Sequence, residues 1–318
     1  MLPLLIDWQC FLDIRHEPIY IIKRLMESDL IIGTGNLITS KFRCRNCESP
    51  QASIVYKDLP DRFHGQPGKF DYVRCDQCSL LQLKKIPGNI SDYYSGYRLH
   101  GEETLLYRMF RRLMIRSYPL QKKFGRGRVL DIGCGNGWFI SAMADRGWDA
   151  YGYEPLSSYA EELSKKLNLK IFSDDDIEKD YDNFFDLVTL NFSLEHLADP
   201  KKILRRVKQM LKQGGMISIT VPNGEGLEAR LFKGKWFHLD PPRHICIFSK
   251  ELLKSVLDDL GFNDIKVRNE AIPTGFAGSF SYVAVGSFSP IIWYLSMIPG
   301  VVFSALVRDG NYTMQATM

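Results

Sequence analysis

The chain lacks the features that mark secreted, repetitive or strongly charged proteins. Its first residues, Met1 to Asp7, hold no basic residue and carry an aspartate inside a short apolar run, so they predict no secretory signal peptide. Internal repeats and low-complexity stretches are also missing, which argues against solenoid and disordered architectures. With 318 residues, 45% hydrophobic composition and a net charge of only +4, the sequence predicts a cytoplasmic globular protein of about two domains.

Charged residues are missing altogether from residues 271–307, and residues 290–307 are almost wholly apolar. A run of this length raises the question of a membrane span. The Pro299–Gly300 pair in its middle predicts a break into two helices of about eight residues, each too short for a bilayer core of roughly 30 Å. Residues 311–318 look like a final strand, which a true span would leave across the membrane. We therefore expect a hydrophobic lid or lobe over the active site, with peripheral membrane contact through 290–307.

Acidic residues are missing from one stretch of the N-terminal half. Residues 1–128 hold 21 Lys and Arg against 13 Asp and Glu, a net charge of +8, whereas residues 129–318 hold 20 against 24, a net charge of −4. Between Arg108 and Arg128 lie eight basic residues and no acid. This run could meet a phosphate-bearing substrate, an anionic lipid or RNA. Because few aromatic residues are interleaved with it, we favour a solvated helix face and expect no nucleic-acid partner.

A glycine-rich turn follows a short apolar strand signal in residues 129–137, V-L-D-I-G-C-G-N-G. Next come a helix signal that stops at Gly147, and a second short strand that ends on Glu154, 21 positions after Gly133. Glycines at such a turn let backbone N–H groups and a helix N-terminus approach a ligand. An acid about 20 residues further on can accept hydrogen bonds from both ribose hydroxyls. The pattern predicts a site for a nucleoside-bearing cofactor.

The residue three positions after Gly135 helps to identify that cofactor. A dinucleotide fingerprint requires glycine or alanine there, whereas this chain has Trp138, which disfavours NAD and FAD. The turn instead resembles the first motif of class I methyltransferases, which bind S-adenosylmethionine. The resemblance implies cofactor contacts from Asp131, Gly133, Gly135, Gly137, Glu154, Asp174 and Asn191.

The resemblance extends over about residues 125–270, and the later segments follow the order of the family fold. We expect strands at 184–192, 216–222 and 265–267, a helix that Asp199 caps and Gly214 ends, and a second helix at 252–260. Strands that alternate with helices predict an α/β fold, a Rossmann-like doubly wound sheet of mostly parallel strands. The family fold has seven strands, and its last strand, here residues 311–318, inserts antiparallel between the fifth and sixth.

Four of the seven cysteines form two C-x-x-C pairs, Cys44 with Cys47 and Cys75 with Cys78. Four thiolates complete a closed tetrahedral shell around one zinc ion, which would then be structural. Two disulfides are the alternative, and the missing secretory signal argues against them. The sequence thus predicts an N-terminal helical extension over 1–40, a zinc ribbon over 41–90 and a methyltransferase domain over 91–318, with the hydrophobic lobe at 271–307.

Two histidines are candidates for the chemistry. His196 stands beside Glu195 just after the strand at 184–192, and His244 lies in the loop W-F-H-L-D-P-P-R-H. Together with the ribbon, these segments resemble zinc-ribbon methyltransferases of glycan and deoxysugar biosynthesis, including sugar C-methyltransferases. This resemblance implies that His244 is the general base, with His196, Glu195 and the aromatic residue Tyr97 beside the acceptor.

A second resemblance concerns the Glu195–His196 pair alone. The pair is similar to the E-x-x-E-H run that holds a divalent cation in ubiquinone-pathway O-methyltransferases. Here Phe192 replaces the first glutamate of the run, which argues against metal-assisted deprotonation.

The sequence predicts an S-adenosylmethionine-dependent methyltransferase with a structural zinc ion. A sulfonium carries its own leaving group, so the protein must mainly position the reactants and supply a base where the nucleophile is protonated. We expect a small-molecule acceptor, a sugar or another intermediate of glycan or lipid biosynthesis, which can be sugar- or lipid-linked. A quinone-type O-methyltransferase is the first alternative. A zinc-ribbon RNA methyltransferase and a catalytically silent scaffold are the others.

Overall fold

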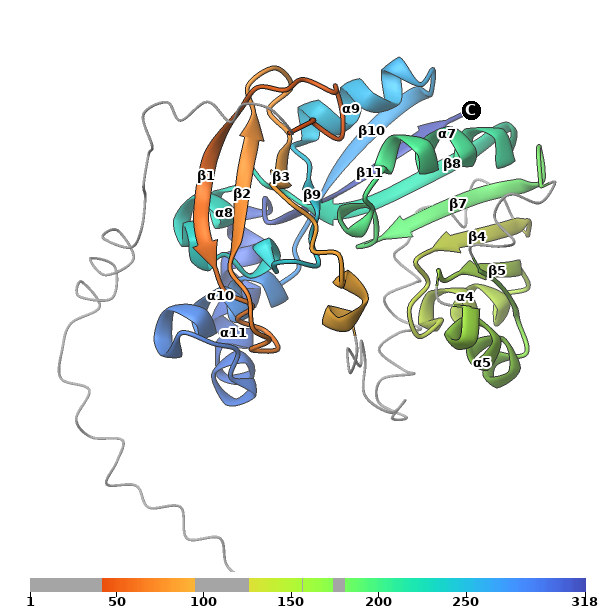
Figure 1. Ribbon diagram of the computed structural model, residues 1–318. Coiled ribbons are helices and arrows are strands. Elements are labelled where there is room, and N and C mark those ends of the chain that lie inside the picture. The colour runs from red at the N-terminus through yellow and green to blue at the C-terminus, as the bar shows by residue number, and fades with distance from the viewer. Residues whose placement is uncertain (1–41, 95–125, 156, 174–180) are drawn as a thin grey trace, which may run out of the picture.

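We describe a computed structural model of the chain, which covers residues 42–94, 126–155, 157–173 and 181–318. Among these residues, seven strands form one twisted sheet in the order β10-β11-β8-β7-β4-β5-β6, and four form a smaller antiparallel sheet in the order β1-β2-β3-β9 (Figure 1). The strands are β1 (Ala52–Leu59), β2 (Phe70–Cys75), β3 (Leu81–Leu83), β4 (Arg128–Ile132), β5 (Asp149–Tyr153), β6 (Lys170–Phe172), β7 (Phe185–Asn191), β8 (Leu211–Pro222), β9 (Cys246–Ile247), β10 (Asn263–Glu270) and β11 (Asn311–Thr317). The helices are α4 (Trp138–Ala144), α5 (Ser157–Leu167), α7 (Pro200–Met210), α8 (Leu227–Phe232), α9 (Lys250–Asp259), α10 (Thr274–Val285) and α11 (Pro290–Val307). Short 3-10 turns are η2 (Ile90–Tyr94), η3 (Leu194–His196), η4 (Lys233–Lys235) and η5 (Phe237–Leu239).

Helices cover both faces of the large sheet, as a doubly wound fold requires. Neighbouring residues of one strand belong to different clusters of buried apolar side chains: Val129 packs with α4 and α5, whereas Leu130 packs with α7 and α9. The same alternation separates Leu187 from Val188 on β7. Because successive side chains of a strand point to opposite faces, the sheet has a separate core on each side.

The predicted α/β architecture is confirmed. Strands β4 to β8 run parallel, and β11 lies antiparallel between β8 and β10. The Asp199 carboxylate caps α7 by accepting a hydrogen bond from the Lys202 N–H at 2.9 Å. The predicted end of this helix at Gly214 is wrong, because Leu211 already has an extended backbone and pairs with Phe185 of β7.

The predicted break at Pro299 is also wrong, because α11 continues through it as one 18-residue helix. Proline removes one helical hydrogen bond, but tertiary packing can compensate for that loss. Here the backbone of Gly300 lies against α10 so closely that a Cβ atom would sit 3.1 Å from the carbonyl oxygen of Pro273. The packing of the whole helix on α10 therefore outweighs the local defect.

The cysteine-bearing sheet shares both backbone pairing and core with the rest of the protein. Leu81 of β3 pairs with Ile247 of β9, so a strand from the second half of the chain completes this sheet. Val73 of β2 belongs to the same buried cluster as Phe248, which directly follows β9. The loop that precedes β9, and carries His244, is therefore fixed from one side by the N-terminal sheet.

A buried ion cluster holds this loop in place. The guanidinium of Arg243 forms a bidentate pair with Asp61, at 2.8 and 3.0 Å, and also contacts Asp240, and the side chains of Arg243 and Asp61 have no exposed surface. Burial alone would lower the pKa of Arg243, but Asp240 and Asp61 raise it well above its usual value. The hydroxyl of Tyr72 on β2 points at the backbone carbonyl oxygens of Leu239 and His244, which share its one proton as acceptors.

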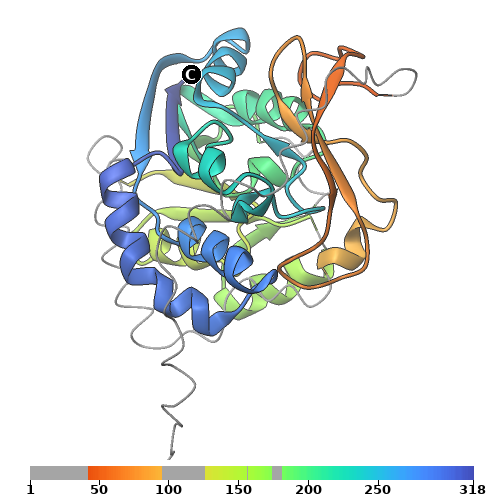
Figure 2. The ribbon, with the colours of Figure 1, turned by 90° about the vertical axis from the view of Figure 1, so that its left-hand side faces the viewer.

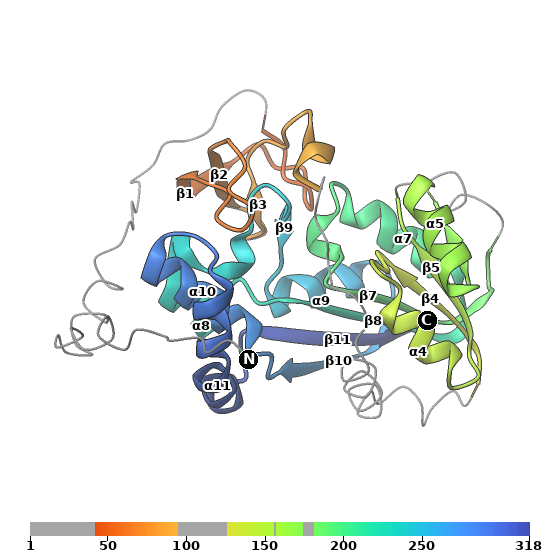
Figure 3. The same ribbon diagram turned by 90° about the horizontal axis from the view of Figure 1, so that it is seen from below.

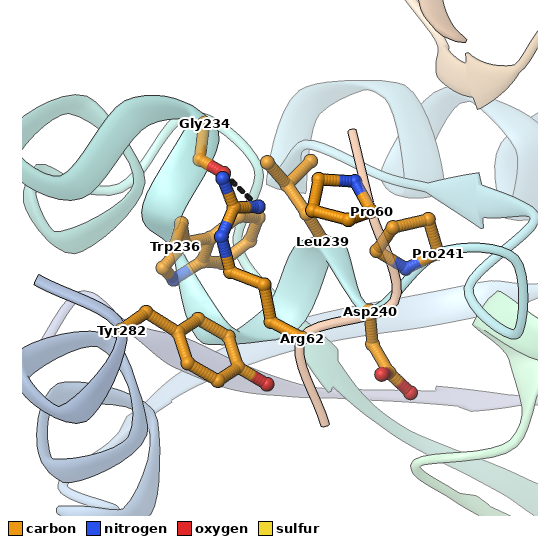
Figure 4. Close-up of a pocket in the computed structure, with 8 residues that line it drawn as sticks. All are labelled: Pro60, Arg62, Gly234, Trp236, Leu239, Asp240, Pro241 and Tyr282. Atoms are coloured by element: carbon orange, nitrogen blue, oxygen red, sulfur yellow. Dashed lines mark hydrogen bonds between the residues drawn. The ribbon is translucent and has the colours of Figure 1, made fainter. Parts of the chain in front are cut away.

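A small pocket marks the junction of three segments (Figure 4). Pro60 and Arg62 line it from the loop after β1, Trp236 and Asp240 from the loop before β9, and Tyr282 from α10. Arg62 closes one side by donating to the carbonyl oxygen of Gly234 at 3.1 Å. The N-terminal sheet, the loop before β9 and α10 therefore meet at one point.

We predict that Asp61→Asn destabilises the protein by about 3 kcal/mol, near the lower end of the range for breaking a buried ion pair. Asparagine can still accept the hydrogen bonds that Asp61 Oδ1 receives from the N–H groups of Phe63 and His64, so the substitution removes the charge and the Oδ2 acceptor of Arg243 and leaves the turn intact. Urea unfolding of wild type and variant measures the difference. Asp149→Asn is the matched control, because Asp149 forms an exposed pair with Arg128 that should contribute less than about 0.5 kcal/mol. Equal losses in both variants would contradict the prediction.

Candidate active site

The turn between β4 and α4 has the backbone conformation that its glycines predict. Gly133, Gly135 and Gly137 have φ values of 71°, 55° and 74°, a region that residues with a side chain rarely adopt. A Cβ atom on Gly133 would also lie 2.6 Å from the Cβ atom of Ser193. The turn is fixed to β5, because the N–H groups of Gly133 and Cys134 both donate to the carbonyl oxygen of Tyr153.

Two carboxyl groups flank this turn at the carboxyl ends of β4 and β5. Asp131 is buried and accepts hydrogen bonds from Thr189 Oγ1 at 2.6 Å and Asn191 Nδ2 at 3.1 Å. Glu154 accepts from the N–H of Gly135 at 3.2 Å. Burial raises the pKa of each carboxyl to about 7. Of the predicted cofactor contacts, Asp131, Glu154, the glycines and Asn191 gather at one edge of the sheet, and Asp174 lies outside the described residues.

These features fit a nucleoside-bearing cofactor. The turn presents backbone N–H groups and has no side chains at its three glycines. Glu154 offers a carboxylate that can accept hydrogen bonds from two adjacent hydroxyls once it has lost its proton. The carboxyl ends of parallel strands in an open sheet form the usual ligand crevice of this architecture.

The second cluster brings together Glu195, His196 and His244. Glu195 and His196 lie in η3, immediately after β7, and His244 comes from the loop before β9. The two imidazole rings are 4.6 Å apart between centroids and almost perpendicular. One ligand atom from each of the three residues lies within 4.8 Å of the others. The structure therefore places the two predicted histidines and the predicted glutamate in direct proximity.

Hydrogen bonds determine which nitrogen of each imidazole is free. Nδ1 of His196 lies 3.0 Å from the carbonyl oxygen of Arg243 and 3.2 Å from the hydroxyl of Tyr94. Nδ1 of His244 lies 2.7 Å from the carbonyl oxygen of His238. A carbonyl oxygen can only accept, so in this arrangement both Nδ1 atoms carry the proton and both Nε2 atoms have a free lone pair.

The protonation of this cluster follows from its burial. Burial lowers the pKa of His196 and His244 to about 3 and raises the pKa of Glu195 to about 8. Within the described residues, neither carboxyl oxygen of Glu195 has a hydrogen-bond partner. At neutral pH the cluster therefore holds two neutral imidazoles and a protonated carboxyl group. Such a cluster can accept a proton from an acceptor at Nε2, and its three side chains, two imidazoles and one carboxyl, could also hold a divalent cation.

Sequence reasoning missed two further buried polar residues beside this cluster. His238 and Glu228 lie within 2.7 Å of the place where a Cβ atom of Gly275 would sit, at the start of α10. His238 Nε2 and Glu228 Oε1 lack a hydrogen-bond partner among the described residues. Burial lowers the pKa of His238 to about 4 and raises the pKa of Glu228 to about 8. The signal for His238 was its position six residues before His244 in one loop, whereas Glu228 on α8 gave none.

The four predicted metal-ligand cysteines lie together. The Sγ atoms of Cys44 and Cys78 are 3.5 Å apart, as are those of Cys47 and Cys75. These separations exceed the roughly 2.05 Å of a disulfide bond and resemble the edge of about 3.8 Å that four sulfurs 2.3 Å from zinc would form. All four cysteines are free thiols in the structure. The cluster is therefore compatible with a zinc site, and its geometry does not favour the disulfide alternative.

Three features singled out in the sequence lie wholly or largely outside the described residues. These are Tyr97, the N-terminal extension over 1–40 and the basic run from 108 to 128, of which residues 108–125 are not described. Tyr94, three residues before Tyr97, does lie at the site and contacts His196. Burial raises its pKa well above the usual tyrosine value, so its hydroxyl stays protonated.

Comparisons with known proteins give consistent results. A family model described as a methyltransferase domain matches residues 104–267, just over half of the 318-residue chain. A stretch of 116 residues is 32% identical to the ubiquinone biosynthesis O-methyltransferase of Yersinia pestis, covering 34% of this chain and 48% of that protein. The chain thus spans about half the length of the curated relatives it matches.

Solved structures of methyltransferases are also similar to the chain. A SAM dependent methyltransferase from Archaeoglobus fulgidus is 20% identical, has a TM-score of 0.48, and is matched over 72% of this chain and 99% of its own. Phosphoethanolamine N-methyltransferase 2 of Haemonchus contortus, in complex with S-adenosyl-L-methionine, is 19% identical and has a TM-score of 0.47. The match covers 75% of this chain and 61% of that protein.

Proposed function

Because this chain belongs to the methyltransferase domain family, we propose that it transfers the methyl group of S-adenosylmethionine to a hydroxyl or an acidic carbon of a small molecule. The family membership makes it an S-adenosylmethionine-dependent methyltransferase. The observation that carries the finer proposal is the cluster of Glu195, His196 and His244, in which both Nε2 atoms have free lone pairs. A nitrogen or thiolate acceptor would need no such base, whereas a protonated oxygen or carbon does.

In this proposal the residues of the cluster have different roles. His244 removes the proton from the acceptor at Nε2, and its Nδ1–H remains bound to the carbonyl oxygen of His238. His196 positions the acceptor, because Tyr94 and the carbonyl oxygen of Arg243 hold its ring from the other side. Above its raised pKa of about 8, Glu195 is ionised before the reaction begins, and its carboxylate would then stabilise the imidazolium that forms. The cofactor supplies the methyl group and its own leaving group, so the protein needs no further acid.

We propose a sugar or another hydroxyl-bearing intermediate of glycan or lipid biosynthesis as the acceptor. The support is the resemblance of the ribbon and the late-loop histidine to sugar-pathway methyltransferases, together with the unpartnered buried atoms of Glu195, Glu228 and His238. Such atoms require hydrogen-bond partners, which a hydroxyl-rich acceptor can supply. Incubation of cell extracts with isotopically labelled cofactor, followed by mass spectrometry, tests the class. Label in a free or lipid-linked sugar supports the proposal, and label in a quinone supports the alternative.

Quinone-type O-methylation is the second candidate, and two observations favour it. The 32% identical relative is an O-methyltransferase of ubiquinone biosynthesis. His244 also approaches Glu195 and His196, where it could replace the glutamate that Phe192 removes from the E-x-x-E-H run. In this candidate the three side chains bind a divalent cation instead of accepting a proton. Turnover of a catechol that rises with Mg²⁺ concentration, and rises further in Phe192→Glu, would select this candidate over the first.

We predict that His244→Gln lowers turnover by about 10² to 10⁴ and leaves cofactor affinity unchanged, because the residue acts on the acceptor proton. Steady-state kinetics and calorimetric titration with the demethylated cofactor measure the two effects. His64→Gln is the matched control, since His64 is exposed near β1 and should behave as wild type. Full activity of His244→Gln combined with inactivity of His196→Gln would transfer the base role to His196. Full activity of both would reject a side-chain base.

We predict that cofactor affinity falls as the pH drops through about 7, the pKa to which burial raises Glu154. The proposed ribose contact needs the ionised carboxylate, so below this pH binding must first remove a proton. Between pH 8 and pH 6 we expect about a tenfold loss of affinity, measured by calorimetry. Glu154→Gln should bind more weakly by about 1.5 to 3 kcal/mol and depend less on pH, whereas the exposed Glu161→Gln should match wild type. An unchanged affinity in Glu154→Gln would reject the ribose role.

For the N-terminal sheet we propose one structural zinc ion, held by Cys44, Cys47, Cys75 and Cys78. The ion would contribute folding free energy to a small sheet with limited core of its own.

We predict one zinc per chain by elemental analysis of protein purified without chelators, and a loss of that zinc in Cys75→Ser. Cys134→Ala should keep it, because Cys134 lies in the glycine turn. Hydrogen exchange should become faster in β3 and β9 of the zinc-free protein, since these strands pair. Wild-type protein without zinc would contradict the proposal.

A further inference from the structure

In helix α11 small residues face the protein and large apolar residues face outward, which is the reverse of the usual arrangement in a soluble protein. Its buried residues are the small ones, Ser296, Gly300 and Ser304, spaced four apart on one face. Large aliphatic residues are exposed, with Ile298 79% and Leu306 81% accessible. The remaining large apolar residues of the helix that are exposed are Ile291, Tyr294, Leu295, Val301 and Val302. Small residues that let two helices approach closely, with large apolar residues outside, are typical of helices packed in lipid.

Several hydroxyl groups of the α10–α11 hairpin form hydrogen bonds within the hairpin or with the residues beside it. The Ser304 hydroxyl donates to the carbonyl oxygen of Ile272 at 3.2 Å, and the Ser279 hydroxyl to that of Gly275 at 2.7 Å. The Ser281 hydroxyl bonds to the backbone of the turn between the helices. No charged residue occurs between 271 and 307. A protein-binding surface usually has a polar rim. The exposed face of α11 therefore matches the acyl region of a bilayer better than a protein partner.

By length and composition, α11 could cross a membrane: its mean hydropathy is 1.8, and only 11% of it is buried. The topology excludes a single crossing by α11, because both ends of the hairpin join the same sheet, and the 12 residues of α10 are too few to cross a bilayer in the other direction. Glu270, at the end of β10, pairs with Asn311, at the start of β11, and β11 also pairs with β8. The hairpin must therefore enter and leave a bilayer on the same side. Figures 2 and 3 show α11 at the outer edge, with α10 between it and the rest of the molecule.

The hairpin also contacts the loop that carries the candidate histidines. The ring of Phe237 in η5 lies against the backbone of Gly278, where a Cβ atom would approach it to 2.2 Å, and the Phe237 N–H donates to the Ser279 hydroxyl. His238 follows Phe237 and accepts the hydrogen bond from His244. A membrane that binds α11 would therefore lie close to the candidate active site.

We propose that the α10–α11 hairpin inserts the exposed face of α11 into one leaflet of a lipid bilayer, and that the acceptor is carried in that bilayer. Tyr294 lies near one end of the helix and Arg308 directly follows the other. Both residue types favour the boundary between acyl chains and head groups. The insertion rests on the hairpin alone, and the membrane-borne acceptor rests on the proposed function. A lipid-linked sugar and a quinone would both be acceptors of this membrane-borne kind.

Flotation with neutral phosphatidylcholine vesicles tests the insertion, in the absence of cofactor and acceptor. We expect wild type to float with the vesicles with little dependence on salt. Ile298→Glu should reduce the partition coefficient at least about tenfold, and Ile298→Glu with Leu306→Glu about a hundredfold or more. Val267→Glu is the matched control, because Val267 is 44% exposed on β10, outside the hairpin. Circular dichroism and calorimetric binding of the demethylated cofactor verify that each variant is folded.

Three outcomes would overturn the insertion. The first is wild type that stays with the soluble fraction, and the second is Ile298→Glu that floats like wild type. The third is a lipid-free dimer in sedimentation experiments that Ile298→Glu dissociates, which would assign the face to a second copy of the chain. Flotation without methyl transfer to any acceptor would instead reject the proposed function and leave the insertion intact.

Discussion

The buried contact between Arg243 and Asp61 is the interaction on which the candidate site depends. Asp61 lies in the loop after β1 of the N-terminal sheet, and Arg243 immediately precedes His244, so one ion pair joins the cysteine-bearing segment to the reacting loop. The carbonyl of the same arginine fixes His196. A desolvated guanidinium needs all of its partners, because an unpaired buried charge is strongly destabilising. The positions of both histidines are therefore coupled to the folding of a segment about 180 residues earlier in the chain.

Much of the fold could be predicted because its signals are local. The glycine turn, the buried strands and the Asp199 cap depend on neighbouring residues, and the structure has each of them. The end of α7 and the continuity of α11 were predicted wrongly, because strand pairing at Leu211 and packing at Gly300 outweigh local preferences. The small sheet was predicted as a separate ribbon, but its fourth strand, β9, comes from a distant part of the chain.

Part of the candidate site could also be predicted from the sequence, and part could not. Resemblance to known families indicated Glu195, His196 and His244, and their loops do meet. The positions of Arg243, Tyr94, Glu228 and His238 could not be predicted, because each depends on contacts between remote segments. The tautomers of the histidines likewise depend on backbone carbonyls, which no sequence pattern reveals. The sequence identifies side chains that can take part in a reaction, and tertiary contacts determine the protonation states of these side chains.

The place of β11 has a consequence for the order in which the molecule is assembled. This strand lies between β8 and β10, yet a ribosome synthesises it after every other described element. Until it emerges, β8 and β10 each present an unpaired backbone edge, and the core beneath them is incomplete. The apolar hairpin α10–α11 emerges just before β11. A chain in which β11 is unpaired therefore exposes the open edges of β8 and β10 together with the most hydrophobic segment of the molecule.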